Sequence, residues 1–322
     1  MDHISNVIED QRVGSGVGAT SIRANSTYVT VKNSYFYTKN NGGSSSLVMA
    51  WADYCTFQNN TIEVEGNVGN LIYLTTYNVD VPSGVVANQH NTIVDNTVRR
   101  LDGQSAAICW GIVIGGPNNL IKNNTIYYAG GTGINGQYGG TTFTGNVYEG
   151  NKLYNAALNA LPGSIVKDNY VEGSSMTVAA GSEAYNNTVT GGSLTVNDAV
   201  AHDNNAKVVA NGESASVYGM VEDLDVKSNV EVTNAIVTGT LRFIGSNSVV
   251  SNSTVNNVVF GESRSGKATN SKLVGSNITG TVTFTQRGSE TNSLIGNNIT
   301  QTVMLQGVND IVYQNNIITT GD

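Results

Sequence analysis

The acidic residues with the closest spacing in this 322-residue chain are Glu222, Asp223 and Asp225. Carboxylates grouped in this way can hold a cation, or serve as acid and base in the cleavage of a polysaccharide. They precede a short apolar segment, and no calcium-binding nonapeptide repeat accompanies them. We therefore expect a solvated acidic surface here, and we predict no catalytic residue, no metal and no cofactor.

Other residues with chemical potential are scattered. His3, His90 and His202 lie far apart in the sequence, which argues against a histidine-centred site. Glu63 and Arg99 occupy equivalent positions in neighbouring repeats, described below, and are expected on adjacent coils. Such a pair is typical of a surface ion pair, which contributes about 0 to 1 kcal/mol, rather than of a catalytic dyad.

Cys55 and Cys109 are the only two cysteines. They are too few for a disulfide scaffold, and they lack the spacing of a metal site. Either the two form one disulfide, or each is a small buried residue.

Aromatic residues are concentrated in the N-terminal half, where the repeats are longest. Flat rings stack on sugars and anchor protein interfaces, so this half is the predicted binding region. An alternative remains open, in which tyrosines fill wide coils and form outward ladders. The predicted binding residues are Trp51, Tyr54, Tyr73, Tyr77, Trp110, Tyr127, Tyr128 and Tyr138.

The elements that must position these residues follow from a repeat. The string FQNNTIEV, with Asn60 as its anchor, recurs as IVDNTVRR, IKNNTIYY, VKDNYVEG and AYNNTVTG. Successive anchors are separated by 36, 28, 27, 18, 18, 18, 24, 24, 24, 21 and 18 residues. Such recurrence is typical of a solenoid. The anchors are Asn60, Asn96, Asn124, Asn151, Asn169, Asn187, Asn205, Asn229, Ser253, Asn277, Asn298 and Asn316.

Each repeat is predicted to contain three short strands. Strand B precedes the Asn turn, strand C follows it, and strand A lies further along, as in residues 71–74, 111–114, 175–178, 193–196, 240–244, 281–284 and 302–305. Their length, β-branching and alternation favour strands over helices. The predicted inward set of strand A is Met176, Val178, Leu194, Val196, Leu241, Phe243, Val282 and Phe284. No single coil can bury its own apolar face, so stability is expected from stacking of neighbouring coils.

Asparagine suits the turn between strands B and C for two reasons. It tolerates the left-handed region better than other residues with a side chain. Its amide also carries donors and acceptors, so one Asn can bond the equivalent Asn in the coils on either side. The preceding position is also Asn or Asp in most repeats, as in Asn59 and Asp95, so two polar ladders are predicted.

The NNTI, NNTV and DNTV turns resemble the right-handed parallel β-helix repeats of the pectate-lyase-like superfamily. The low charge, the abundance of Asn, Thr and Tyr, and the irregular coil lengths resemble adhesin-like surface proteins of methanogenic archaea. We predict an all-β, right-handed parallel β-helix of about twelve coils, forming one domain over residues 1–322, with 1–20 as a cap or partial coil. The 18-residue coils also suit a left-handed helix, but the longer coils break its six-residue period.

Composition excludes several classes of partner. The net charge is −8, and the basic residues are scattered singly, which disfavours nucleic acid and anionic membranes. No apolar run is long enough to span a membrane, and the N-terminus lacks the features of a signal peptide. We therefore expect a segment of a larger multidomain chain that is extracellular and attached to the cell surface.

Glycosylation sequons occur at Asn25, Asn59, Asn123, Asn186, Asn252, Asn277 and Asn298. Most of them coincide with the repeated turn, so they are expected to be by-products of the repeat. An Asn buried in its turn could not carry a glycan.

The leading functional hypothesis is a non-catalytic, adhesin-like or stalk module that binds glycans or a partner cell. The alternative is a polysaccharide lyase, hydrolase or epimerase of the same fold. Two acids, or an acid and an arginine, converging within about 5 to 9 Å on an outward sheet would favour the enzyme.

Overall fold

The structure is a computed structural model that describes residues 6–9, 12–15, 27–40, 47–50, 52–66, 70–75, 85–101, 110–136, 143–261, 267–285, 289–305, 312–314 and 316–318. All regular elements of these residues are β-strands, and the pairs between them are parallel. Among the residues described, there is no helix that could cross a membrane. The predicted right-handed parallel β-helix is confirmed.

The chain divides into two compact units. Unit 1 contains residues 1–182 and 189–192, and unit 2 contains residues 183–188 and 193–322. The single domain expected over residues 1–322 stays a prediction. The first two strands, β1 (Asn6–Glu9) and β2 (Arg12–Ser15), pair with the next coil, so residues of the 1–20 segment form part of a coil.

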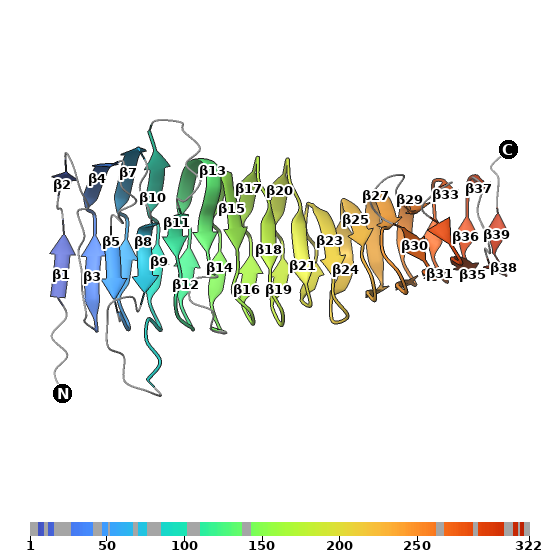
Figure 1. The fold of residues 1–322 in the computed structure, drawn as a ribbon, viewed down its shortest axis with the longest axis horizontal. Coiled ribbons are helices and arrows are strands. Elements are labelled where there is room, and N and C mark those ends of the chain that lie inside the picture. Colours follow the sequence, from blue (N-terminus) through green and yellow to red (C-terminus); the bar gives the residue numbers. More distant parts are fainter. Residues whose placement is uncertain are drawn as a thin grey trace. The chain divides into compact units, whose positions relative to one another are not determined.

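In unit 1, successive coils place equivalent strands side by side (Figure 1). The B strands are β1, β3 (Val29–Lys32), β6 (Thr56–Gln58), β9 (Thr92–Val94), β12 (Leu120–Lys122), β14 (Val147–Glu149) and β16 (Ile165–Lys167). The C strands are β2, β4 (Tyr35–Asn40), β7 (Thr61–Gly66), β10 (Thr97–Arg100), the first parts of β13 (Thr125–Asn135) and β15 (Lys152–Asn159), and β17 (Tyr170–Glu172). The A strands are β5 (Leu47–Ala50), β8 (Asn70–Thr75), β11 (Trp110–Val113), the second parts of β13 and β15, and β18 (Met176–Val178).

Unit 2 repeats the arrangement. Its B strands are β19 (Glu183–Tyr185), β22 (Val200–His202), the first part of β24 (Ser216–Val221), β26 (Glu231–Thr233), β28 (Val249–Ser251), β31 (Lys272–Val274), β35 (Ser293–Ile295) and β38 (Val312–Gln314). Its C strands are the second part of β24, the first parts of β27 (Ala235–Phe243) and β29 (Thr254–Phe260), β32 (Asn277–Ile278), β36 (Asn298–Ile299) and β39 (Ile317–Ile318). Its A strands are β21 (Leu194–Asn197), β23 (Lys207–Asn211), β25 (Asp223–Val226), the second parts of β27 and β29, β33 (Val282–Phe284) and β37 (Val303–Leu305). Strand β20 (Thr188–Thr190) is shared, since Thr188 belongs to unit 2 and its other two residues belong to unit 1. In unit 2, the short strand β30 (Ala268–Thr269) pairs with β34 (Ser289–Glu290).

The core consists of columns of like side chains, one from each coil. All eight residues of the predicted inward set of strand A are fully buried, which confirms the alternation. In unit 2, the rings of Phe243, Phe260 and Phe284 stack with centroids 4.5 Å apart and interplanar angles of 4° and 1°. Offset or parallel aromatic contacts of this kind contribute about 0.5 to 1.5 kcal/mol per pair beyond the burial of area.

The ladder of anchors is confirmed in unit 1 at Asn60, Asn96, Asn124, Asn151 and Asn169. The backbone N–H and Nδ2 of Asn96 both donate to Oδ1 of Asn124, at 3.0 and 2.9 Å, and Asn124 donates likewise to Asn151. Nδ2 of Asn124 also donates to the carbonyl of Ile93. Each amide inside the ladder therefore satisfies both its donors and its acceptor without water.

In unit 2 the predicted ladder is wrong at four positions. The ladder residues are Asn204, Ser276 and Asn297, one residue before the predicted Asn205, Asn277 and Asn298. The chain also makes one more coil between Asn187 and Ser253 than predicted, with corners at Gly219 and Asn234, so Asn229 lies at a different turn. The apolar residues Met220 and Ala235 follow these corners, which removed the Asn signal. The anchors Asn187, Ser253 and Asn316 are correct.

The two residues of each Asn corner have separate roles. The outer residue adopts positive φ, for example Asn59 (52°), Asn123 (54°), Asn186 (54°) and Asn252 (50°), and it is exposed. The next residue turns inward and is buried, at 1% exposure for Asn60 and 0% for Asn124 and Asn187. The left-handed conformation thus belongs to the outer residue, not to the anchor. Four of the sequon asparagines, Asn59, Asn123, Asn186 and Asn252, are outer residues of this kind, so these sequons fall on the repeated turn but not on its buried ladder position.

Candidate functional site

A cluster of four charged side chains lies on the outward face of the A strands of unit 2. Lys207 comes from β23, Asp223 and Asp225 from β25, and Arg242 from β27. The parallel register places Asp223 opposite Lys207, and Asp225 opposite Arg242. In these strands the intervening residues, such as Leu224 and Leu241, point into the core. The alternation of the strands therefore directs all four charges to the same side.

The charges are close enough to form a connected network. Lys207 Nζ lies 2.7 Å from Asp225 Oδ2, and Arg242 Nη1 lies 3.1 Å from Asp225 Oδ1 and 3.2 Å from Asp223 Oδ2. Asp223 also accepts the backbone N–H of Thr240 at 2.7 Å. Asp223 and Asp225 are two residues apart on one strand, so their Cα atoms are separated by about 7 Å.

Exposure differs strongly within this cluster. The side chain of Asp225 is only 8% exposed, whereas that of Lys207 is 41% exposed. Those of Arg242 and Asp223 are each 28% exposed. Burial acts to lower the pKa of Arg242, but hydrogen bonds and charge from Asp225 and Asp223 outweigh it and raise that pKa. Arg242 is thus a permanent cation that fixes both carboxylates, while Lys207 and Asp223 face solvent.

The solvated acidic surface predicted for Glu222, Asp223 and Asp225 is wrong for Asp225, which is ion-paired and buried, whereas Glu222 is exposed and Asp223 is ion-paired but partly exposed. The prediction failed because residues 207–211 and 223–226 were not recognised as A strands. Alternation of Val208 with Ala210, and of Leu224 with Val226, was the available signal. Recognising it would have placed two acids and a lysine beside Arg242.

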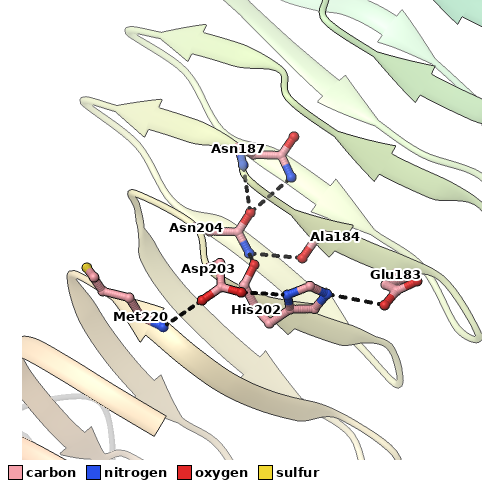
Figure 2. A network of polar contacts seen from close by, with 7 residues as sticks. All are labelled: Glu183, Ala184, Asn187, His202, Asp203, Asn204 and Met220. Carbon is pink, nitrogen blue, oxygen red and sulfur yellow. Dashed lines mark hydrogen bonds and ion pairs between the residues drawn. The ribbon is translucent and has the colours of Figure 1, made fainter.

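A second polar cluster lies on the B strands of unit 2, around His202 (Figure 2). His202 Nδ1 lies 3.0 Å from Asp203 Oδ2, and Nε2 lies 3.2 Å from Glu183 Oε1. The imidazole stacks between the rings of Tyr185 and Tyr218, at 5.1 and 4.6 Å. Its hydrogen bond holds the pKa of Asp203 below the usual value. Both ring nitrogens and both ring faces are therefore occupied, which favours a structural role. No group of three or more His, Cys, Asp or Glu residues in the described parts of the chain could hold a metal.

Among the predicted binding residues, Tyr54 and Tyr127 are exposed, at 45% and 41%. Each belongs to an outward stack. Tyr54 lies between Tyr28 and His90, with centroids 5.2 and 5.0 Å away, and Tyr127 lies 5.0 Å from Tyr154. Stacking covers much of the ring faces and leaves the edges to solvent. This arrangement matches the outward ladders of the alternative interpretation.

The stack around Tyr54 is also strained. Tyr28, Tyr54 and His90 have φ of 64°, 57° and 56°, where later coils of the unit place Asn118 or Gly145. A bulky side chain in this region costs on the order of 1 to 2 kcal/mol. Three such residues together cost about 3 to 6 kcal/mol, and the two stacked pairs, at about 0.5 to 1.5 kcal/mol each, offset only part of that total.

The remaining binding predictions fall into three groups. Tyr73 lies in β8 and is buried, at 6% exposure, and Trp110 lies in β11 and is partly exposed. Tyr128 lies in strand β13. Trp51, Tyr77 and Tyr138 lie outside the described residues. The role of all eight predicted residues in binding stays a prediction.

Other predicted contacts can be placed. Glu63 and Arg99 form the expected surface ion pair, with Arg99 Nη1 3.5 Å from Glu63 Oε1. Cys55 is a buried thiol that accepts from the N–H of Val29 and donates to the carbonyl of Asp53, as the second cysteine interpretation requires. Cys109 lies outside the described residues.

No family model matches the sequence, and no curated protein matches it. Three similar solved structures are right-handed parallel β-helix proteins. The A-module of mannuronan C-5 epimerase AlgE6 from Azotobacter vinelandii is 13% identical, with 99% of this chain and 92% of that chain covered, at a TM-score of 0.38. A PL6 alginate lyase in complex with a trisaccharide is 9% identical, with coverage of 98% and 80%, at a TM-score of 0.39. A mannuronic acid specific family 6 lyase from human gut microbiota is 10% identical, with coverage of 95% and 77%, at 0.34.

Proposed function

We propose that this chain acts on an acidic polysaccharide as a lyase or epimerase, at the outward cluster of Lys207, Asp223, Asp225 and Arg242. The observation that carries the proposal is the convergence of two acids, an arginine and a lysine on one face of the A strands. The neighbouring outward positions of that face in unit 2 are neutral: Thr195, Val209, Val259, Thr283 and Met304. The cluster is therefore a local departure from the repeat.

The chemistry of a uronic acid polymer defines what such a site must provide. The hydrogen on the carbon next to the carboxylate is removed by a base, and a cation must stabilise the negative charge that develops on the carboxylate. Asp223, at 28% exposure, is the accessible base, and Lys207, at 41%, is the most exposed cation. Asp225 and Arg242 hold these two groups in place.

After proton removal, two outcomes are possible for the same intermediate. In elimination, the bond from the adjacent ring carbon to the glycosidic oxygen breaks, a carbon–carbon double bond forms, and the departing oxygen takes up a proton to become the hydroxyl of a new chain end. Return of a proton to the opposite face of the carbon inverts its configuration. The cluster therefore supports the enzymatic alternative, with reaction at a carbon acid as its defining step.

The test is an activity screen on uronic acid polymers, with neutral glucans in parallel. Elimination is followed by the absorbance of unsaturated products, and epimerisation by nuclear magnetic resonance. Lys207→Met and Asp223→Asn should each lower activity by about 10²-fold or more, while Thr283→Ala on the same sheet should have no effect. Activity that survives both cluster substitutions, in protein with unchanged circular dichroism, would refute the assignment.

A second candidate is the non-catalytic, extracellular adhesin-like module expected from the sequence. The strain at the Tyr28, Tyr54 and His90 turn, which ring stacking offsets only in part, and the ring edges that Tyr54 leaves exposed favour it. Its partner would be a glycan or a surface protein of another cell. Tyr54→Ala should then weaken binding on a glycan array by more than about tenfold. Unchanged binding, together with activity in the uronan screen, would leave only the enzymatic proposal.

A further inference from the structure

The sequon asparagines of the B–C corners occupy the outer position, where a modification can be accommodated. Asn123, Asn186 and Asn252 are exposed, with φ of 54°, 54° and 50°. The inner ladder residues that follow them, Asn124, Asn187 and Ser253, are at most 3% exposed. The corner thus presents one side chain to solvent and uses the next one to hold the coils together.

The amide nitrogens of these three residues are available for reaction. Among the residues that the structure describes, none accepts a hydrogen bond from Nδ2 of Asn123, Asn186 or Asn252. Two other sequons, at Asn59 and Asn298, differ in this respect. Asn59 Nδ2 donates to Asn33 Oδ1 at 2.9 Å, and Asn298 Nδ2 donates to Asn277 Oδ1 at 3.2 Å.

The third sequon residue is also placed suitably. Thr125 and Thr188 are the first residues of C strands and are partly exposed, and Thr254 begins β29 and is exposed. In each case the inner ladder residue lies between the Asn and the Thr and points into the core. The Asn amide and the Thr hydroxyl that define the sequon are therefore both outside the core.

We propose that Asn123, Asn186 and Asn252 are N-linked glycosylation sites. The donor is a lipid-linked oligosaccharide. The amide nitrogen forms a bond to the anomeric carbon of the sugar, the bond from that carbon to the lipid phosphate breaks, and the phosphate leaves with the electron pair. The amide proton passes to a base of the transferase. The ladder bonds of Asn124 and Asn187 are not involved, so the glycans leave the stack of coils intact.

The test expresses the full chain behind a secretion signal in an N-glycosylating eukaryotic host, with a sequon in a C-terminal tag as a positive control. Glycopeptide mass spectrometry should find most molecules modified at Asn123, Asn186 and Asn252. Thr125→Ala should remove the modification at Asn123 alone. Enzymatic removal of the glycans should leave the circular dichroism spectrum unchanged, since the core does not contact them.

A gain of modification provides the sharper comparison. Asp95 has the same outer position and a φ of 57°, so Asp95→Asn completes a sequon with Thr97 and should add one glycan. Asp168→Asn is the matched control, because Tyr170 supplies no sequon hydroxyl and no glycan should appear. Secreted protein that is modified at the tag but at neither the natural corners nor Asp95→Asn would overturn the proposal. Modified protein that fails to fold would overturn it as well.

Discussion

Replacement of Phe260 by alanine tests how the core of unit 2 is built. Phe260 is fully buried between Phe243 and Phe284, with ring centroids 4.5 Å away on both sides. Phe→Ala substitutions in cores cost about 3 to 5 kcal/mol through lost transfer energy and the cavity left behind. Because two stacked pairs are lost as well, we expect Phe260→Ala near the upper end of that range.

Position along the column sets the expected order of effects. Phe284 stacks on Phe260 on one side, and the equivalent residue of the next coil, Leu305, is 62% exposed. Removal of the Phe284 ring therefore leaves a less enclosed cavity than removal of the Phe260 ring, so Phe284→Ala should cost about 3 kcal/mol, at the lower end of the range. Thr283→Ala, at the outward position one residue before Phe284, should cost under about 1 kcal/mol.

The assay is urea unfolding followed by far-ultraviolet circular dichroism, with midpoints compared at constant m-value. Trp51 and Trp110, the only tryptophans, belong to unit 1, so tryptophan fluorescence follows that unit separately. Phe260→Leu keeps most of the apolar volume and should cost under about 1.5 kcal/mol. Equal midpoint shifts for Phe260→Ala and Thr283→Ala would refute the assignment of inward and outward faces.

Three further predictions concern other parts of the molecule. Asn124→Ala removes the acceptor of two buried donors of Asn96, so it should lower the free energy of unfolding by about 2 to 5 kcal/mol. Asn123→Asp at the exposed corner should lower it by less than about 0.5 kcal/mol. Similar melting temperatures of the two variants would contradict the inner ladder. The hydrogen bond from Lys122, aided by Lys167, lowers the pKa of Glu149. The stability that these ion pairs contribute is therefore present above the unfolded pKa of Glu149, about 4.3, and is lost as the pH falls through its lower pKa in the folded protein. Glu149→Gln should flatten this acid limb of the stability curve, and an unchanged limb would be inconsistent with the ion pairs. Burial raises the pKa of the Cys55 thiol, so in a Cys109→Ser background alkylation should be more than about tenfold slower in native than in denatured protein; equal rates would show that the thiol is accessible.

The sequence by itself determined the fold and the phase of its strands. Alternation of two residues in segments such as 281–284, and the paired Asn corners such as Asn123 and Asn124, are local signals. They depend on strand geometry and on the tolerance of Asn for positive φ, so they can be read without knowing what the chain packs against. The inward set of strand A and the unit 1 ladder were predictable for this reason.

Only the tertiary structure decided which residues share a coil position in unit 2. Met220 and Ala235 occupy the inner ladder position without a side-chain amide, so the local signal disappears and one coil is missed. Lateral pairing between coils, set by the hydrogen bonding of parallel backbones, then brings Lys207, Asp225 and Arg242 together from three strands. Contacts between coils also decide which asparagine of a corner is exposed and which is buried. The buried, inner residue is the one that hydrogen-bonds to the next coil. The turn within a coil depends on a few adjacent residues, whereas contacts between coils depend on which distant segments pair, and only the tertiary structure shows that pairing.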